Sequence, residues 1–297
     1  MNEAIKYRFQ TILVATDFGE SASAALPYAR ALARAHKARI VITHVIDPAS
    51  YAFPDGVPSS LALGEETRQE IRRMEEETRR QGIAVHSQVQ TGMICDRILQ
   101  SVKEMHADLL ILGTRAKGKA GRAALGTVAR QVLAHTPCPV LTVSKEAMDH
   151  LPHSGCWRRV LIATDFSVAS LEALDFAHRI TLDLLTIVHA EPCLEHNESE
   201  TCLERLRFLA PFNESHTVPV EHVVATGDAA EVIVREAQKT RTDLVVLGSP
   251  AEELSGEDFE SSTVLHVISA VNCPVICVPS TLRIPVPAAA KEVAEPC

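Results

Sequence analysis

Val14-Ala15-Thr16-Asp17-Phe18 decides the fold, because it returns later in the chain as Ile162-Ala163-Thr164-Asp165-Phe166, 148 residues on. Three further blocks follow in the same order, and each returns after 135 residues. Thr-Gly at 91–92 returns at 226–227, Asp-Leu-Leu-Ile-Leu-Gly at 108–113 returns as Asp-Leu-Val-Val-Leu-Gly at 243–248, and Cys-Pro-Val at 138–140 returns at 273–275. Four blocks in constant order predict two tandem copies of one folding unit.

The repeat predicts the domain organisation. We expect a first domain at residues 1–146, a linker at 147–157, a second domain at 158–282 and a disordered tail at 283–297. The offset falls from 148 to 135 between the first block and the Thr-Gly block, so the second copy has lost 13 residues there. We expect the loss to correspond to residues 48–64, a stretch rich in Pro, Ser and Gly.

Within the first copy, short aliphatic runs alternate with stretches of helical periodicity. Strands are expected over residues 11–15, 39–45, 85–90, 109–112 and 140–143, and helices over 21–36, 65–81, 95–105 and 127–135. This pattern predicts an α/β fold of two tandem Rossmann-like, doubly wound domains, each a five-stranded parallel sheet with helices on both faces. Ligands of such sheets bind beyond the carboxyl ends of the strands, where Asp17, Val45 and Gly113 fall.

Composition excludes several classes of partner. The 297 residues carry a formal net charge of −9, which argues against nucleic acid or an anionic membrane as the main partner. No apolar run reaches the roughly 18–20 residues that a membrane helix needs. The amino terminus lacks the basic start and apolar run of a secretory signal, so we expect a soluble cytoplasmic protein.

Cysteine and histidine positions give no metal prediction. The 8 cysteines form no Cys-x-x-Cys pair and have no regular spacing, so we expect free thiols rather than a zinc site or disulfide framework. His150 and His153 lie in the expected linker without further ligand types nearby, and we expect them to be solvated. The sequence therefore predicts no metal site.

The segment 113–128 is the chemically informative one. It follows a buried strand, carries glycines at 113, 118, 121 and 126, and leads into a helix at Gly126-Thr127. Its four cations have no acid between them: Arg115, Lys117, Lys119 and Arg122. Glycines, cations and a helix amino terminus together favour an anion, above all phosphate. A solvated basic loop with Thr127 as an ordinary helix N-cap fits the same residues, so both interpretations remain open at this point.

Family resemblance favours the first interpretation. The segment resembles the G-x2-G-x9-G-[ST] nucleotide loop of the universal stress protein family, with Ala116 in place of the second glycine. Thr16-Asp17-Phe18 and His44-Val45 match two further family blocks. Two successive copies of the family pattern together cover nearly the whole chain, so the chain looks like a tandem universal stress protein.

The resemblance implies ATP or another adenine nucleotide as ligand, with Mg²⁺ as an optional companion. Asp17 would contact the adenosine part, Ala15 and Thr16 would line its pocket, and Val45 would offer backbone groups to the adenine. The phosphates would be held by the remaining expected site residues: Leu112, Gly113, Arg115, Gly126, Thr127 and Val128. Ala116 is expected to weaken binding. A structural cap of the following helix is the alternative for Asp17, since Asp165 shares its position.

The corresponding segment of the second copy has lost these features. Ser261-Ser262 replaces Gly-Thr, and Pro250 removes a backbone donor. Five acidic residues stand where the first loop has four cations: Glu252, Glu253, Glu257, Asp258 and Glu260. Like charges near phosphates are unfavourable, so we expect one ATP per chain, bound by the first copy.

Three hypotheses for function remain. The first is a nucleotide-binding regulatory stress protein whose occupancy changes the surface shown to an unidentified protein partner. The second is a scaffold that binds no nucleotide, and the third, a slow ATPase, ranks last because the sequence shows no nucleophile–base pair and no Gly-Lys-Ser/Thr loop ending. We therefore expect no enzyme. The last strands, 140–143 and 275–278, are expected to pair in a pseudo-twofold arrangement within one chain, and a homodimer remains an option.

Overall fold

A computed structural model describes residues 7–48, 60–114, 125–193, 196–210, 218–249 and 262–280. Both contrasting loops of the sequence analysis, at 115–124 and 250–261, lie outside the described residues, as does the tail at 283–297.

The first half of the chain alternates strands and helices as predicted. Its elements are β1 (Thr11–Ala15), α1 (Glu20–His36), β2 (Arg39–Ile46), α2 (Ser60–Arg80), β3 (Val85–Thr91), α3 (Ile94–Glu104), β4 (Leu109–Gly113), α4 (Thr127–His135) and β5 (Val140–Val143). A short 3-10 helix, η2 (Lys145–His150), then leads towards the second half.

The second half repeats the order of the first. Its elements are β6 (Trp157–Ala163), α5 (Val168–Ile180), β7 (Thr181–Glu191), α6 (His196–Leu209), β8 (Val220–Thr226), α7 (Ala229–Lys239), β9 (Leu244–Ser249), α8 (Thr263–Ala270) and β10 (Val275–Pro279). Trp157, expected in the linker, is instead the first residue of β6 and is fully buried.

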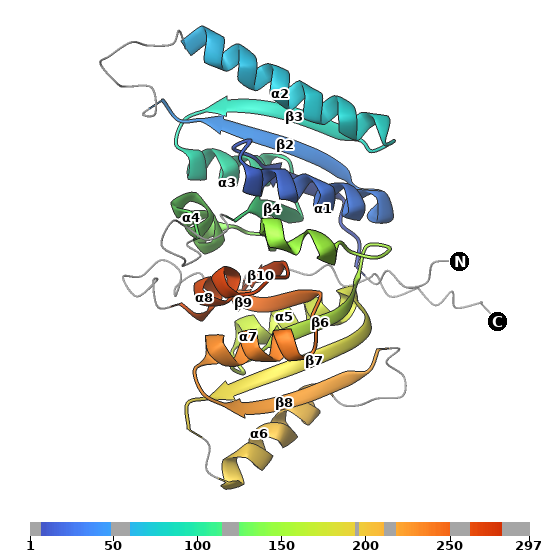
Figure 1. The fold of residues 1–297 in the computed structure, drawn as a ribbon, viewed down its shortest axis with the longest axis vertical. Coiled ribbons are helices and arrows are strands. Elements are labelled where there is room, and N and C mark those ends of the chain that lie inside the picture. Colours follow the sequence, from blue (N-terminus) through green and yellow to red (C-terminus); the bar gives the residue numbers. More distant parts are fainter. Residues whose placement is uncertain are drawn as a thin grey trace, which may run out of the picture.

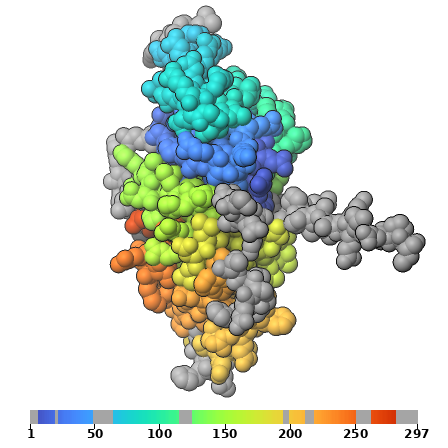
Figure 2. Space-filling model, turned by 90° about the vertical axis from the view of Figure 1, so that its right-hand side faces the viewer, coloured from blue at the N-terminus to red at the C-terminus, as the bar shows by residue number. Residues whose placement is uncertain are grey.

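All ten strands form one continuous sheet in the order β3-β2-β1-β4-β5-β10-β9-β6-β7-β8. Pairing is parallel within each half, and the antiparallel β5–β10 pair joins the halves. The halves lie end to end in Figure 1, with α2 and α6 at opposite ends, and meet across the middle of the molecule in Figure 2. The predicted fold class and the predicted pairing of the last strands are confirmed.

Helices cover both faces of the sheet, and each covered face forms one hydrophobic cluster. Buried residues of α1, α2, α5 and α6 share one cluster with alternate residues of the strands. Buried residues of α3, α4, α7 and α8 share the other. The core is therefore mostly aliphatic, as expected for doubly wound sheets.

The residues lost from the second copy come from two places rather than one. His44 and His189 occupy equivalent positions, because each ring contacts the carbonyl oxygen of the threonine after the first strand of its half. The offset there is 145, so 3 residues are lost before β7 and 10 after it. For the first loss, α5 has 13 residues against 17 in α1, and α5 passes directly into β7 at Thr181 without the two-residue turn that separates α1 from β2. The start of β7, 3 residues earlier relative to its histidine than that of β2, makes up part of the difference. The expectation of one deletion near residues 48–64 was therefore wrong in part.

One contact packs Tyr7, at the start of the described chain, against α5, and another packs the connection between the halves against α1. The Tyr7 and Phe176 rings meet edge to face, 5.2 Å between centroids. Gly155 has φ +87°, and a Cβ on it would lie 2.5 Å from Nε2 of His36, so only glycine fits there.

Among the described residues, no helix has both the length and the apolar character needed to cross a membrane.

Candidate functional site

The predicted site residues gather at one edge of the first half-sheet. Ala15, the last residue of β1, lies opposite Thr43 of β2 and Leu112 of β4. Gly113 ends β4 opposite Val143. Because these parallel strands end on the same side, the positions after them form one edge.

The turn after β1 is held by Thr16 and His44. The backbone N–H of Thr16 donates to the Thr43 carbonyl at 3.0 Å, and Thr16 Oγ1 accepts from the Phe18 N–H at 3.0 Å. Nδ1 of His44 lies 2.8 Å from the Thr16 carbonyl oxygen. Phe18 has φ 61°, and its ring lies 4.5 Å from the His44 ring. In the sequence His44 stands out only as part of a matching family block, but in the structure its ring fixes this turn.

Asp17 is exposed at the tip of the turn. Its Oδ1 accepts a hydrogen bond from the Gly19 N–H at 2.9 Å, and Asp165 accepts the same bond from Ser167 at 2.9 Å. Burial opposes ionisation of Asp165, but hydrogen bonds from Ser167 and Ser170 outweigh it and lower its pKa. Asp17 is therefore not a helix cap, since Gly19 is the N-cap of α1 and Ser167 that of α5, but its turn hydrogen bond is present in both halves. Oδ2 is the oxygen that a ligand can share without breaking the turn.

Val45 offers its backbone towards this edge. Alternate residues of a strand direct their N–H and C=O groups to the same neighbour, and Thr43 bonds to Thr16 on the β1 side. The backbone groups of Val45 therefore point to the side of β1 at a level that β1 no longer reaches. Ala15, Val45 and Leu112 belong to one hydrophobic cluster, against which Val128 packs.

The start of α4 provides backbone donors. Gly126 is the N-cap residue, with φ −62° and ψ 150°, and Thr127 is the first, exposed residue of the helix. Thr127 is therefore not the N-cap, contrary to the alternative in the sequence analysis. The first N–H groups of a helix lack carbonyl partners within it, and Gly126 has no side chain to cap them. Among the described residues, a Cβ built on Gly126 would meet nothing within 4 Å.

Gly248, the counterpart of Gly113, has a packing role. A Cβ on Gly248 would lie 2.5 Å from the backbone carbon of Ala169, so the start of α5 requires glycine there. At the other end of the second loop, α8 begins at Thr263 with Ser262 as its N-cap. Ser262 corresponds to Thr127 in the repeat, so α8 starts one residue later than α4.

The structure thus places nine of the ten expected site residues at or beside one edge, at the ends of three strands and the start of α4. They are Ala15, Thr16, Asp17, Val45, Leu112, Gly113, Gly126, Thr127 and Val128. Arg115, the tenth, lies outside the described residues, as does Ala116.

Comparison with known proteins gives consistent matches. A universal stress protein from Thermus aquaticus, encoded in the QAH/OAS sulfhydrylase 3' region, is 33% identical over 140 residues, covering 46% of this chain and 98% of the relative. A universal stress protein of Mycolicibacterium smegmatis is 26% identical over 261 residues, covering 80% of this chain and 86% of the relative. The crystal structure of a universal stress protein from Archaeoglobus fulgidus superposes with a TM-score of 0.71 at 18% identity, covering 91% of this chain and 98% of that one.

The model of the universal stress protein family matches the chain twice, over residues 8–144 and 157–279. The two matches fall on the two halves of the ten-stranded sheet, which agrees with the internal repeat. This chain belongs to the universal stress protein family, as a tandem member with two family units in one polypeptide.

Proposed function

We propose that the chain is a cytoplasmic regulatory protein of the stress response that binds one adenine nucleotide, ATP, in its first half. The observation that carries this proposal is the start of α4. There, the N-cap Gly126 leaves the helix donors uncapped by a side chain, and no atom of the described part of the chain fills the space where a Cβ would lie. A phosphate needs both features, since it must come within hydrogen-bond distance of the backbone N–H groups.

In this proposal, each part of the nucleotide meets a different element. The backbone groups of Val45 take the adenine edge, and Ala15 and Thr16 line the adenosine pocket beside Asp17. The N–H groups of Thr127 and Val128 take the phosphates, next to Gly113. Mg²⁺ enters as a companion of the phosphates, since it binds through few carboxylates plus phosphate oxygens.

The second half, in this proposal, binds no ATP. Its helix α8 starts one residue later than α4, and its N-cap carries the side chain of Ser262, which makes no hydrogen bond to the helix donors but occupies space that Gly126 leaves free. The five acidic residues of the second loop add repulsion to phosphates. Nucleotide occupancy would then change the surface of the first half alone, and a protein partner would read that change.

Equilibrium binding of labelled ATP to the full chain, stripped of nucleotide, tests the proposal. Saturable binding at one site supports it, and absence of binding makes a scaffold the better account. Phosphate release by the intact protein tests the slow ATPase, which the proposal does not include. Repeating the titration with a chelator measures the contribution of Mg²⁺.

A further inference from the structure

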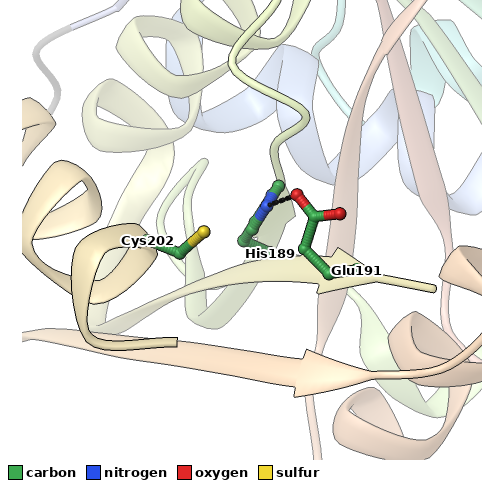
Figure 3. Close-up of side chains that lie close together, drawn as sticks. All are labelled: His189, Glu191 and Cys202. Atoms are coloured by element: carbon green, nitrogen blue, oxygen red, sulfur yellow. Dashed lines mark hydrogen bonds and ion pairs between the residues drawn. The ribbon is translucent and has the colours of Figure 1, made fainter. Parts of the chain in front are cut away.

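Three potential metal ligands converge in the second half, where sequence analysis expected none. His189 and Glu191 lie two residues apart on β7, so their side chains emerge on the same face of the sheet. Cys202 approaches them from α6, which packs over that face (Figure 3). One ligand atom from each residue lies within 4.8 Å of the other two.

The orientation of the His189 ring suits a metal ligand. Its Nδ1 lies 2.8 Å from the carbonyl oxygen of Thr164, which can only accept, so Nδ1 carries a proton. Metal-binding histidines commonly donate their second ring N–H to a backbone carbonyl in this way. The other nitrogen, Nε2, is thereby directed towards Glu191 and Cys202.

The side chains of His189 and Glu191 are already in contact. Nε2 lies 2.9 Å from Oε1 of Glu191. With Nδ1 facing the Thr164 carbonyl, Nε2 directs its lone pair towards the carboxylate of Glu191. A metal ion fits between these two ligand atoms, and the thiol of Cys202 adds a third donor.

The first half provides an internal comparison. His44 makes the same contact with Thr16, at the same 2.8 Å, and its ring also lies 4.5 Å from a phenylalanine. At the position of Glu191, however, the first half has Ile46, an apolar residue. The common fold therefore orients the histidine, whereas the carboxylate and the thiol beside it belong to the second half.

We propose that His189, Glu191 and Cys202 bind one Zn²⁺ ion. Nitrogen, oxygen and sulfur donors together suit zinc, whose tetrahedral ligand atoms lie about 3.3–3.7 Å apart. The three ligand atoms lie within 4.8 Å of one another, and the His189–Glu191 contact is 2.9 Å, so metal binding requires only side-chain adjustments of this order. Zinc binds between His189 and Glu191, and the thiol proton of Cys202 is released to solvent on binding.

Burial sets the character of the site. The side chain of His189 is 5% exposed, whereas that of Glu191 is 39% exposed, so the metal is reached from the Glu191 side. A water molecule takes the fourth position there, as in zinc sites with three protein ligands. The second half would thus hold a metal site at the edge of its sheet that corresponds to the proposed nucleotide site of the first half.

Cobalt titration of the full chain, freed of metal and nucleotide, tests the site. Co²⁺ is expected to bind once per chain with the visible bands of tetrahedral cobalt and a thiolate charge-transfer band, and Zn²⁺ is expected to remove both. Cys202→Ser is expected to lose the charge-transfer band, and Glu191→Gln to weaken metal affinity about tenfold or more. Cys95→Ser, which alters a half-buried cysteine of the first half, is the control and is expected to match the wild type.

Glu191→Gln keeps the shape of a half-exposed side chain, so its fold is expected to survive, and circular dichroism without metal checks this for each variant. Zinc is also expected to raise the unfolding midpoint of the wild type but not of Glu191→Gln. A charge-transfer band that persists in Cys202→Ser, or a wild type that binds no cobalt, would overturn the site and leave an ordinary His–Glu ion pair.

Discussion

Leu141 lies directly opposite Ile276 in the antiparallel β5–β10 pair, and each is the counterpart of the other in the repeat. The flanking pairs, Val140 with Cys277 and Thr142 with Val275, are exchanged by the same symmetry. A pseudo-twofold axis therefore passes between Leu141 and Ile276. The two halves of this chain meet as two identical subunits would, and each last strand covers the edge of the other.

Leu141 and Ile276 are both fully buried in the same hydrophobic cluster, so truncation of each is expected to be costly. Leu141→Ala and Ile276→Ala should each lower the free energy of unfolding by about 2–5 kcal/mol. Because the two side chains face each other, their effects should deviate from additivity by about 0.5–3 kcal/mol in urea unfolding. Val41→Ala, in β2 three strands from β5, is the control and should be additive with Leu141→Ala. If the effects of Leu141→Ala and Ile276→Ala were additive, as those of Leu141→Ala and Val41→Ala should be, the contact between the two side chains at the β5–β10 pair would be contradicted.

Replacement by alanine at Gly248 and at Gly126 is expected to have different effects on the stability of the fold. Gly248→Ala should destabilise the fold by about 1–3 kcal/mol, because its Cβ would overlap the backbone of Ala169 and Ser170. Gly126→Ala should leave stability unchanged or slightly raised, since φ is −62° and the space beside it is open. Urea unfolding of the two variants measures the contrast, and equal effects would show that Gly248 is not fixed by packing.

Because His36 is buried, we expect the protein to lose stability in mild acid. The ring is 4% exposed, accepts a hydrogen bond from the Phe9 N–H on Nδ1 and donates to the Gly155 carbonyl from Nε2. Burial lowers the pKa of His36 below 6.5, its ordinary value. The unfolded state then binds the proton first, so the free energy of unfolding falls as pH decreases below about 6.5.

His36→Gln removes this titration, so its stability should decline less than that of the wild type between about pH 7 and pH 5. His86→Gln, at an exposed position of β3, serves as control and should follow the wild-type curve. The measurement is urea unfolding across this pH range. An unchanged slope in His36→Gln would show that another group is responsible.

Asp17 combines a turn with a proposed ligand contact, and two substitutions separate them. Asp17→Asn keeps an acceptor for the Gly19 N–H, so stability should hold, whereas Asp17→Ala should lose about 0.5–1.5 kcal/mol. Both should weaken ATP binding, because both remove the carboxylate. Asp165→Asn, at the same turn of the second half, should leave ATP affinity unchanged. Normal ATP affinity in Asp17→Asn would reduce Asp17 to a turn residue.

Much of the fold was predictable because the strands are short, aliphatic and repeated. The expected bounds of α4 and β5 agree with the structure residue for residue, and Gly82 lies just beyond α2 with φ 75°. The direct passage from α5 into β7 was missed, because a helix end next to a strand leaves no turn residues to mark it. Gly126 has φ −62°, which sequence alone cannot distinguish from the positive φ of a turn glycine.

The metal cluster was missed for a different reason. His189 and Glu191 form a short motif on one strand, but Cys202 is brought to them by the packing of α6 rather than by spacing. A comparison of His44-Val45-Ile46 with His189-Ala190-Glu191 would have shown a carboxylate gained beside a repeated histidine. The location of the expected nucleotide residues was predictable because parallel strands end at one edge, whereas the closeness of α5 to Gly248 depends on packing.

Calorimetric titration of the nucleotide-free full chain with ATP tests the central claim most directly. The account predicts one ATP per chain, loss of binding in Gly126→Val, and unchanged binding in Ser261→Val, at the repeat counterpart of Gly126. A valine at position 126 fits the extended backbone, so its branches fill the space beside the helix donors without unfolding the protein. Two sites per chain, full affinity in Gly126→Val, or no binding by the wild type would contradict the account.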